Sequence, residues 1–111
     1  MDIETEKLSS VTAVVRCSGR LNMIAASGLK AHLDRTVDDG HRQVVVDLSG
    51  VAFIDSSGLG ALIGGLKKAR QSGGDLRLAG ATEQVTEVLR LTNLDRVLRP
   101  YDSVENATSA W

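Results

Sequence analysis

The segment Asp55-Ser56-Ser57-Gly58 brings together a carboxylate, two hydroxyls and a glycine, the residue types in this chain best suited to chemistry. An apolar run precedes the segment, and apolar residues at helical spacing follow it. This pattern predicts a buried strand that gives way to a helix at the segment. Asp55 or Ser56 can cap that helix, and Gly58 permits close packing in its first turn. A structural role alone therefore accounts for these residue types.

Three motifs that place a glycine-rich turn after a strand do not fit here. A P-loop ends in Gly-Lys-Ser or Gly-Lys-Thr, and the chain contains neither. A nucleophile elbow needs glycine where Ile54 stands. The dinucleotide fingerprint fails because its third glycine is misplaced, and Gly60 and Gly64 fall inside the predicted helix. We therefore expect the chain not to be an enzyme.

The cysteine and the histidines show no metal-ligand spacing. Cys17 is the single cysteine, so it forms no intramolecular disulfide and no cysteine-based metal site. It stands in a β-branched segment, where a small buried hydrophobe is the expected role. His32 and His41 are isolated, the first on a predicted helix and the second in the turn after it. We expect no metal and no cofactor.

Charge and hydropathy exclude two classes of partner. Thirteen Lys and Arg balance fourteen Asp and Glu, for a net charge of -1, which is unlike the basic surface of a nucleic-acid binder. The acidic N-terminus lacks the plan of a signal peptide. No apolar run approaches the ~20 residues that span a bilayer. The sequence predicts a soluble, cytoplasmic protein that binds neither nucleic acid nor membrane.

The periodicity of apolar residues predicts a single α/β domain over residues 1–111. We expect a mostly parallel sheet of about five strands, with an antiparallel N-terminal edge hairpin and about four helices. Asn22 and Thr82 are placed to cap two of the helices. Strands are predicted at 3–8, 11–17, 43–48, 51–54, 75–80 and 96–99, with a turn at 49–50 between the third and fourth segments. Helices are predicted at 24–37, from the 55–58 segment to about 71, at 82–91 and from 103.

The order of motifs around the 55–58 segment resembles a known family. Asp-Ser-Ser-Gly-Leu-Gly at 55–60 follows Val-Val-Val-Asp-Leu-Ser at 44–49 and Val-Ala-Phe-Ile at 51–54. This combination is similar to the signature of STAS domains and, more narrowly, of the bacterial anti-sigma factor antagonists (anti-anti-sigma factors). Residues 19–22 resemble the family's Gly-x-Leu/Ile-Asp loop, and 73–78 and 91–94 resemble its next strand and its third helix with the following turn. The resemblance covers essentially the whole chain.

The resemblance implies partner switching. In this family the unmodified protein binds an anti-sigma factor that is also a serine kinase, which releases the sigma factor. The kinase then phosphorylates the first serine of the turn, here Ser56, and a metal-dependent serine phosphatase reverses the modification. We expect a monomer when free, because no long amphipathic extension is left over. The residues expected to bind the partner are Asn22, Met23, Ile24, Asp55, Ser57, Gly58 and Leu59.

The chain departs from the family pattern at Asn22, where the family loop usually ends in Asp, and at Arg20, where many relatives carry an acid. Asn22 keeps a hydrogen-bonding oxygen and lacks the charge, which weakens the case for phosphorylation more than the case for binding. Two alternatives therefore stay open. The chain could be an unphosphorylated STAS module of a stressosome-like scaffold or of a lipid-transport ATPase, or a small nucleotide-binding protein or enzyme, suggested only by the α/β architecture.

Overall fold

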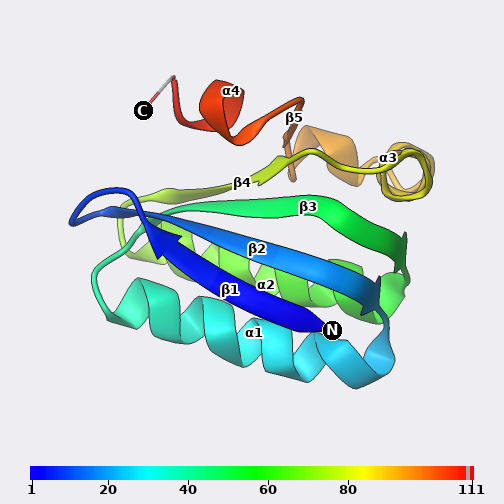
Figure 1. The fold of residues 1–111 in the computed structure, drawn as a ribbon, viewed down its shortest axis with the longest axis horizontal. Coiled ribbons are helices and arrows are strands. Elements are labelled where there is room, and N and C mark those ends of the chain that lie inside the picture. Colours follow the sequence, from blue (N-terminus) through cyan, green and yellow to red (C-terminus); the bar gives the residue numbers. More distant parts are fainter. Residues whose placement is uncertain (110) are drawn as a thin grey trace.

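A computed structural model of the chain describes residues 1–109 and 111, and five strands form one sheet in the order β1-β2-β3-β4-β5. β1 pairs with β2 antiparallel, and the remaining neighbours are parallel (Figure 1). The predicted mixed sheet with an antiparallel N-terminal edge is thereby confirmed. The strands are β1 (Asp2–Lys7), β2 (Thr12–Leu21), β3 (Gln43–Ile54), β4 (Asp75–Ala79) and β5 (Pro100–Tyr101).

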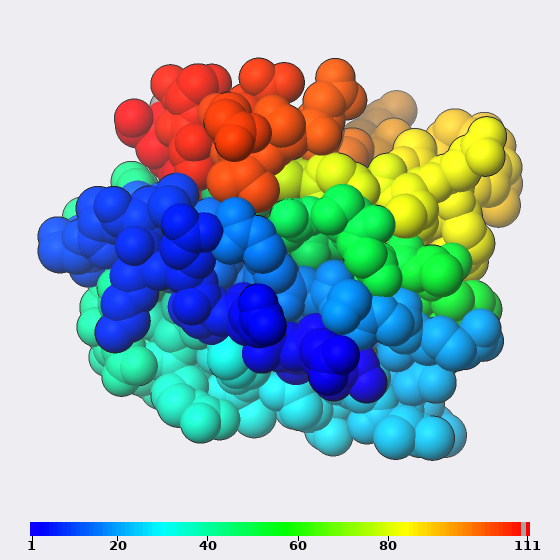
Figure 2. Space-filling model, in the orientation of Figure 1, coloured from blue at the N-terminus to red at the C-terminus, as the bar shows by residue number. Residues whose placement is uncertain are grey.

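The helices lie on both faces of the sheet. α1 and α2 pack side by side against one face, and α4 covers the other, so the strands separate them (Figure 1). In Figure 2 the C-terminal segment, in red and orange, and α1, in cyan, lie on opposite sides of the blue strands. α3 lies beside the carboxyl-terminal end of β3. The bounds are α1 (Met23–Asp38), α2 (Ser56–Gln71), α3 (Glu83–Leu91) and α4 (Val104–Thr108), with a 3-10 helix η1 (Leu94–Arg96).

The central strand β3 is buried on both faces. Val44, Val45 and Val46 are fully buried in succession, as predicted for a parallel strand covered by helices on both sides. Because successive side chains point to opposite faces, Val44 and Val46 join the large cluster under α1 and α2, and Val45 joins a smaller cluster with Ala107 of α4. The sheet is thus held in place from both sides.

The turn predicted at Ser49-Gly50 is wrong, because β3 continues through it to Ile54. Arg16 pairs with Asp47 and Ser18 with Gly50, so two residues of β3 lie opposite one residue of β2, which is a β-bulge. Gly50 is needed for close approach: a Cβ there would lie 2.9 Å from the Cβ of Ser18. The bulge lets one continuous strand carry the chain to the 55–58 turn.

The last strand was also misplaced, since residues 96–99 form no strand. Asn93 adopts a left-handed conformation (φ 59°) and starts η1, and the backbone N–H of Leu98 donates to Leu94 O at 2.7 Å. These local bonds leave the chain extended only at Pro100 and Tyr101, which form β5 beside β4.

Among the described residues, no helix is long and apolar enough to cross a membrane.

Candidate functional site

Two neighbouring parallel strands end at the same edge of the sheet, and a helix follows each. Leu21, the last residue of β2, pairs with Ile54, the last residue of β3. The backbone N–H of Asp55 extends this ladder by donating to Leu21 O at 3.3 Å. The start of α1 and the start of α2 therefore lie side by side, although about thirty residues separate them in sequence.

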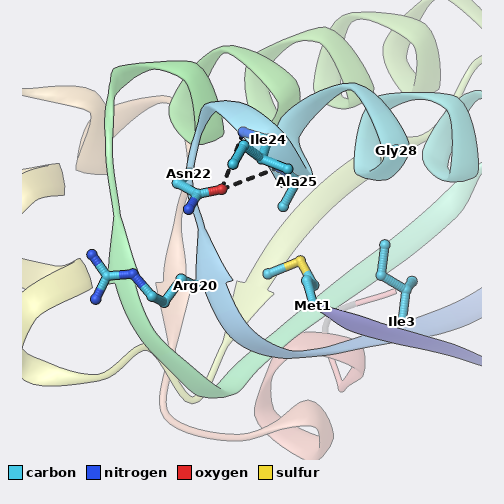
Figure 3. A pocket seen from close by; sticks show the side chains of 7 residues that line it. All are labelled: Met1, Ile3, Arg20, Asn22, Ile24, Ala25 and Gly28. Carbon is cyan, nitrogen blue, oxygen red and sulfur yellow. Dashed lines mark hydrogen bonds between the residues drawn. The ribbon is translucent and has the colours of Figure 1, made fainter.

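Each helix carries a side-chain cap at its start. Asn22 Oδ1 accepts from the backbone N–H groups of Ile24 at 3.1 Å and Ala25 at 3.2 Å (Figure 3), which confirms its predicted capping role. At α2 the cap is Asp55, whose Oδ1 accepts from the N–H of Gly58 at 3.0 Å. These bonds satisfy donors that have no partner within the first turn of a helix.

Because Asp55 caps α2, the cap does not require the hydroxyl of either serine that follows it. Ser56 is the first residue of α2 and is exposed, and Ser57 beside it is half-buried. Within residues 1–109 and 111, neither hydroxyl makes a hydrogen bond in the free chain. Ser56 stands where the helix dipole is positive, a location that favours added negative charge.

Gly58 and Leu59 support the turn from inside the molecule. A Cβ on Gly58 would lie 2.5 Å from Leu21 O and 2.7 Å from Leu21 Cγ, so only glycine lets α2 begin this close to β2. Leu59 is 5% exposed and belongs to the main core. Both were predicted to bind the partner, but the structure buries them beneath the exposed surface around Ser56, since α2 must bury its apolar side against the sheet.

The exposed apolar side chains of the site come from the start of α1. Met23 is 73% exposed and Ile24 is 86% exposed. Ile24 also lines a shallow groove of about 510 Å³ whose other lining residues are Met1, Ile3, Arg20, Asn22, Ala25 and Gly28 (Figure 3). Clustered exposed apolar side chains are characteristic of surfaces that contact another protein.

The histidines and the cysteine stand away from this turn. His41 precedes β3, whereas Ser56 follows it, so the two lie at opposite ends of the strand. His32 Nε2 is hydrogen-bonded to the Thr5 hydroxyl of β1, and burial lowers its pKa, as does the nearby Arg35. Burial raises the pKa of the Cys17 thiol to about 12, so this side chain is a protected hydrophobe, as the sequence predicted.

Comparisons with known proteins agree with this arrangement of fold and turn. The STAS domain family matches residues 2–107. A candidate anti-sigma factor antagonist of Thermotoga maritima is 39% identical over 74 residues, which are 67% of this chain and 66% of the relative's length. The anti-sigma F factor antagonist of Paenibacillus polymyxa is 29% identical over 108 residues, which are 96% of this chain and 92% of the relative.

Solved structures share the fold over nearly the whole chain. The crystal structure of a candidate antagonist from Thermotoga maritima superposes with a TM-score of 0.89 at 30% identity, covering 97% of this chain and 92% of that one. The anti-sigma factor antagonist SpoIIAA superposes in its unphosphorylated form with a TM-score of 0.83 at 20% identity, over 98% and 96% of the two chains. The phosphorylated form of SpoIIAA, from Bacillus, superposes with a TM-score of 0.76 at 18% identity, covering 99% of this chain and 100% of that one. The chain therefore belongs to the STAS domain family, and the relatives described above bear the name anti-sigma factor antagonist.

Proposed function

We propose that this chain is an anti-sigma factor antagonist and that Ser56 is the residue at which its partner, an anti-sigma factor with serine kinase activity, switches it off. The observation that carries the proposal is the exposed Ser56 hydroxyl at the start of α2, which has no hydrogen-bond partner within the described part of the chain and stands next to a separate capping residue, Asp55. The names of the curated relatives support the antagonist role. The chain is then the substrate of the kinase and not itself an enzyme.

The docking face in this proposal consists of the exposed and half-buried residues around Ser56. Met23 and Ile24 supply apolar surface, and each contributes about 1.5–3 kcal/mol if a partner buries it fully. The polar groups of this face come from Asn22, Asp55 and Ser57. Gly58 and Leu59 hold this face in position from below.

Phosphorylation would reverse binding without changing the fold. A phosphate on Ser56 adds about -1.5 to -2 charges, which the dipole of α2 and its first-turn N–H groups accommodate. A bound partner would instead meet a solvated dianion beside the Asp55 carboxylate. Each 1.4 kcal/mol of repulsion or desolvation weakens binding about tenfold, so a few kcal/mol suffice. SpoIIAA, which has the same fold, exists in both forms, which supports this tolerance.

The proposed cycle has two further participants. Antagonist bound to the anti-sigma factor frees the sigma factor for transcription in the cytoplasm. A metal-dependent serine phosphatase then removes the phosphate from Ser56 and restores a monomeric, binding-competent antagonist.

The test is the intact mass of the chain after incubation with candidate kinase-type anti-sigma factors and ATP. We expect one phosphate on the wild type and on Ser57→Ala, none on Ser56→Ala, and dissociation of the complex once phosphate is added. Equal phosphorylation of Ser56→Ala would refute the assignment of the acceptor. A stable complex that never takes phosphate, or copurification with a transporter ATPase, would instead favour an unphosphorylated STAS interaction module.

A further inference from the structure

The carboxyl-terminal half of β3 has a free edge next to α3. β4 pairs with β3 only from Gln43 to Asp47, and among the described strands none pairs with residues 48–54 on that side. Ile54 is 1% exposed, so its backbone groups are shielded from water. A buried backbone N–H or C=O without a partner costs about 1–3 kcal/mol, so this edge needs hydrogen bonds from elsewhere.

The first turn of α3 provides those bonds through side chains. Gln84 Oε1 accepts from the backbone N–H of Ile54 at 3.0 Å, and Gln84 Nε2 donates to Ile54 O at 3.4 Å. Thr82 Oγ1 donates to Val51 O at 2.9 Å. Thr82 therefore does not cap α3 with its side chain, contrary to the sequence prediction, because its hydroxyl is bonded to β3.

A carboxamide suits this location for a chemical reason. It carries one acceptor and one donor group side by side, as a peptide group does, and so can replace a strand partner for one residue. Glutamate could accept from the Ile54 N–H but could not donate to Ile54 O. Methionine, of similar length, could do neither. The pair of bonds therefore depends on glutamine at position 84.

These bonds act immediately before the site. Ile54 precedes Asp55, whose N–H is held by Leu21 O on the β2 side of β3. The backbone that enters the turn is therefore fastened from both sides, by β2 and by Gln84 of α3. Ser56 follows two residues after Ile54, so these bonds hold the backbone immediately before the residue that carries the hydroxyl.

We propose that Gln84 is a positioning residue that holds the Ser56 turn in the geometry required for phosphorylation and partner binding; its consequence for phosphorylation rests on the proposed function. Gln84 bonds to Ile54 and acts on Ser56 only through the backbone. A kinase requires the attacking hydroxyl at a fixed place, and errors of about 1 Å cost up to about a hundredfold in rate. Loss of the Gln84 bonds frees the end of β3 and with it the start of α2.

The first experiment uses the free chain of residues 1–111 and needs no partner. Amide hydrogen exchange is compared between wild type, Gln84→Met and Gln71→Met, the same substitution at an exposed site in the last turn of α2. We expect exchange at residues 54–58 to accelerate about tenfold in Gln84→Met, as loss of a buried hydrogen bond implies, and to be unchanged in Gln71→Met. Acceleration confined to α3, or none at 54–58, would overturn the proposal.

The second experiment measures phosphorylation of the same variants under conditions where urea titration shows all of them folded. We expect kcat/KM of the kinase to fall about tenfold or more for Gln84→Met. An additional variant, Gln84→Glu, should give a value between those of the wild type and Gln84→Met, because it keeps one bond. Wild-type kcat/KM in Gln84→Met, despite faster exchange, would reject a positioning role. If the wild type itself takes no phosphate, the proposed function fails, and the exchange data still decide whether Gln84 holds the turn.

Discussion

In the proposed switch, Ser56 is available for modification because the neighbouring residue, Asp55, caps α2. A serine that capped the helix would have its oxygen bonded to a backbone N–H, and a phosphate there would compete with the cap. With Asp55 Oδ1 on the Gly58 N–H, the hydroxyl of Ser56 faces solvent without a partner among the described residues. The capping function and the proposed switch are thus assigned to adjacent residues.

Two glycines near the start of α2 differ in how much space a side chain would have. Gly58 has no room for a side chain, since a Cβ would lie 2.5 Å from Leu21 O and 2.9 Å from Ile54 Cγ1. Gly60 is exposed, and a Cβ there would meet nothing within 4 Å. Only the first glycine is therefore required by the fold.

These two glycines give a matched prediction within one helix. Gly58→Ala should lower the free energy of unfolding by about 1–3 kcal/mol, because backbone and core atoms must move to admit the methyl group. Gly60→Ala should raise it by about 0.5–1 kcal/mol, because alanine is the better helix former. Urea unfolding followed by circular dichroism measures both. A Gly58→Ala protein as stable as the wild type would contradict the close contact between α2 and β2.

Among the elements, the ends of β2 and β3 decide where the site forms. Their parallel pairing brings the first turns of α1 and α2 together, with Asn22 and Asp55 as the two caps. The proposed docking face therefore draws on two segments distant in sequence, and each depends on its own cap for a defined first turn. A substitution of either cap should therefore lower the stability of its helix even when no partner is bound.

For α1, Asn22→Ala should lower the free energy of unfolding by about 1 kcal/mol, since Asn22 accepts from two backbone N–H groups. Asn22→Asp should retain wild-type stability, because a carboxylate caps as well and interacts favourably with the helix dipole. Equilibrium denaturation of the three proteins tests this. Equal losses in both variants would show that the amide contributes more than its oxygen.

In the whole molecule, Arg77 of β4 ties the C-terminal segment to the face of the sheet opposite α1 and α2. Its guanidinium lies 4.2 Å from the Trp111 ring centroid and 5.5 Å from that of Tyr101. Its Nη1 donates to Ala107 O of α4 at 2.7 Å. Buried cation–π and hydrogen-bond contacts of this kind stabilise a small second cluster that contains few apolar residues.

Replacement of Arg77 by methionine should loosen α4 and leave the Ser56 turn intact. Trp111 is the single tryptophan, so its fluorescence reports this contact: we expect its emission to shift to the red and the free energy of unfolding to fall by about 1–3 kcal/mol. Arg99→Met, at an exposed site before β5, serves as the control. Unchanged emission in Arg77→Met would show that Trp111 is held by other contacts.

The sequence alone determined features that depend on neighbours along the chain. Apolar periodicity predicted the order of helices and strands, the continuous burial of β3 at residues 44–46, and the cap at Asn22. The residue types around Ser56 and the family resemblance also predicted a turn suited to regulation by a partner, and this stays a prediction. These features were accessible because helix caps and amphipathic patterns are local interactions, specified within a few residues.

Only the tertiary structure decided features that depend on strand register and contacts across the fold. The bulge at Leu48-Ser49, opposite Cys17, arises from how β3 pairs with β2, and burial of Leu59 removes it from the proposed docking face. The hold of Gln84 on Ile54 exists because β3 runs beyond β4 and exposes an edge to α3. No local pattern signals such bonds, since an unpaired backbone group is satisfied by whichever side chain the fold brings within reach.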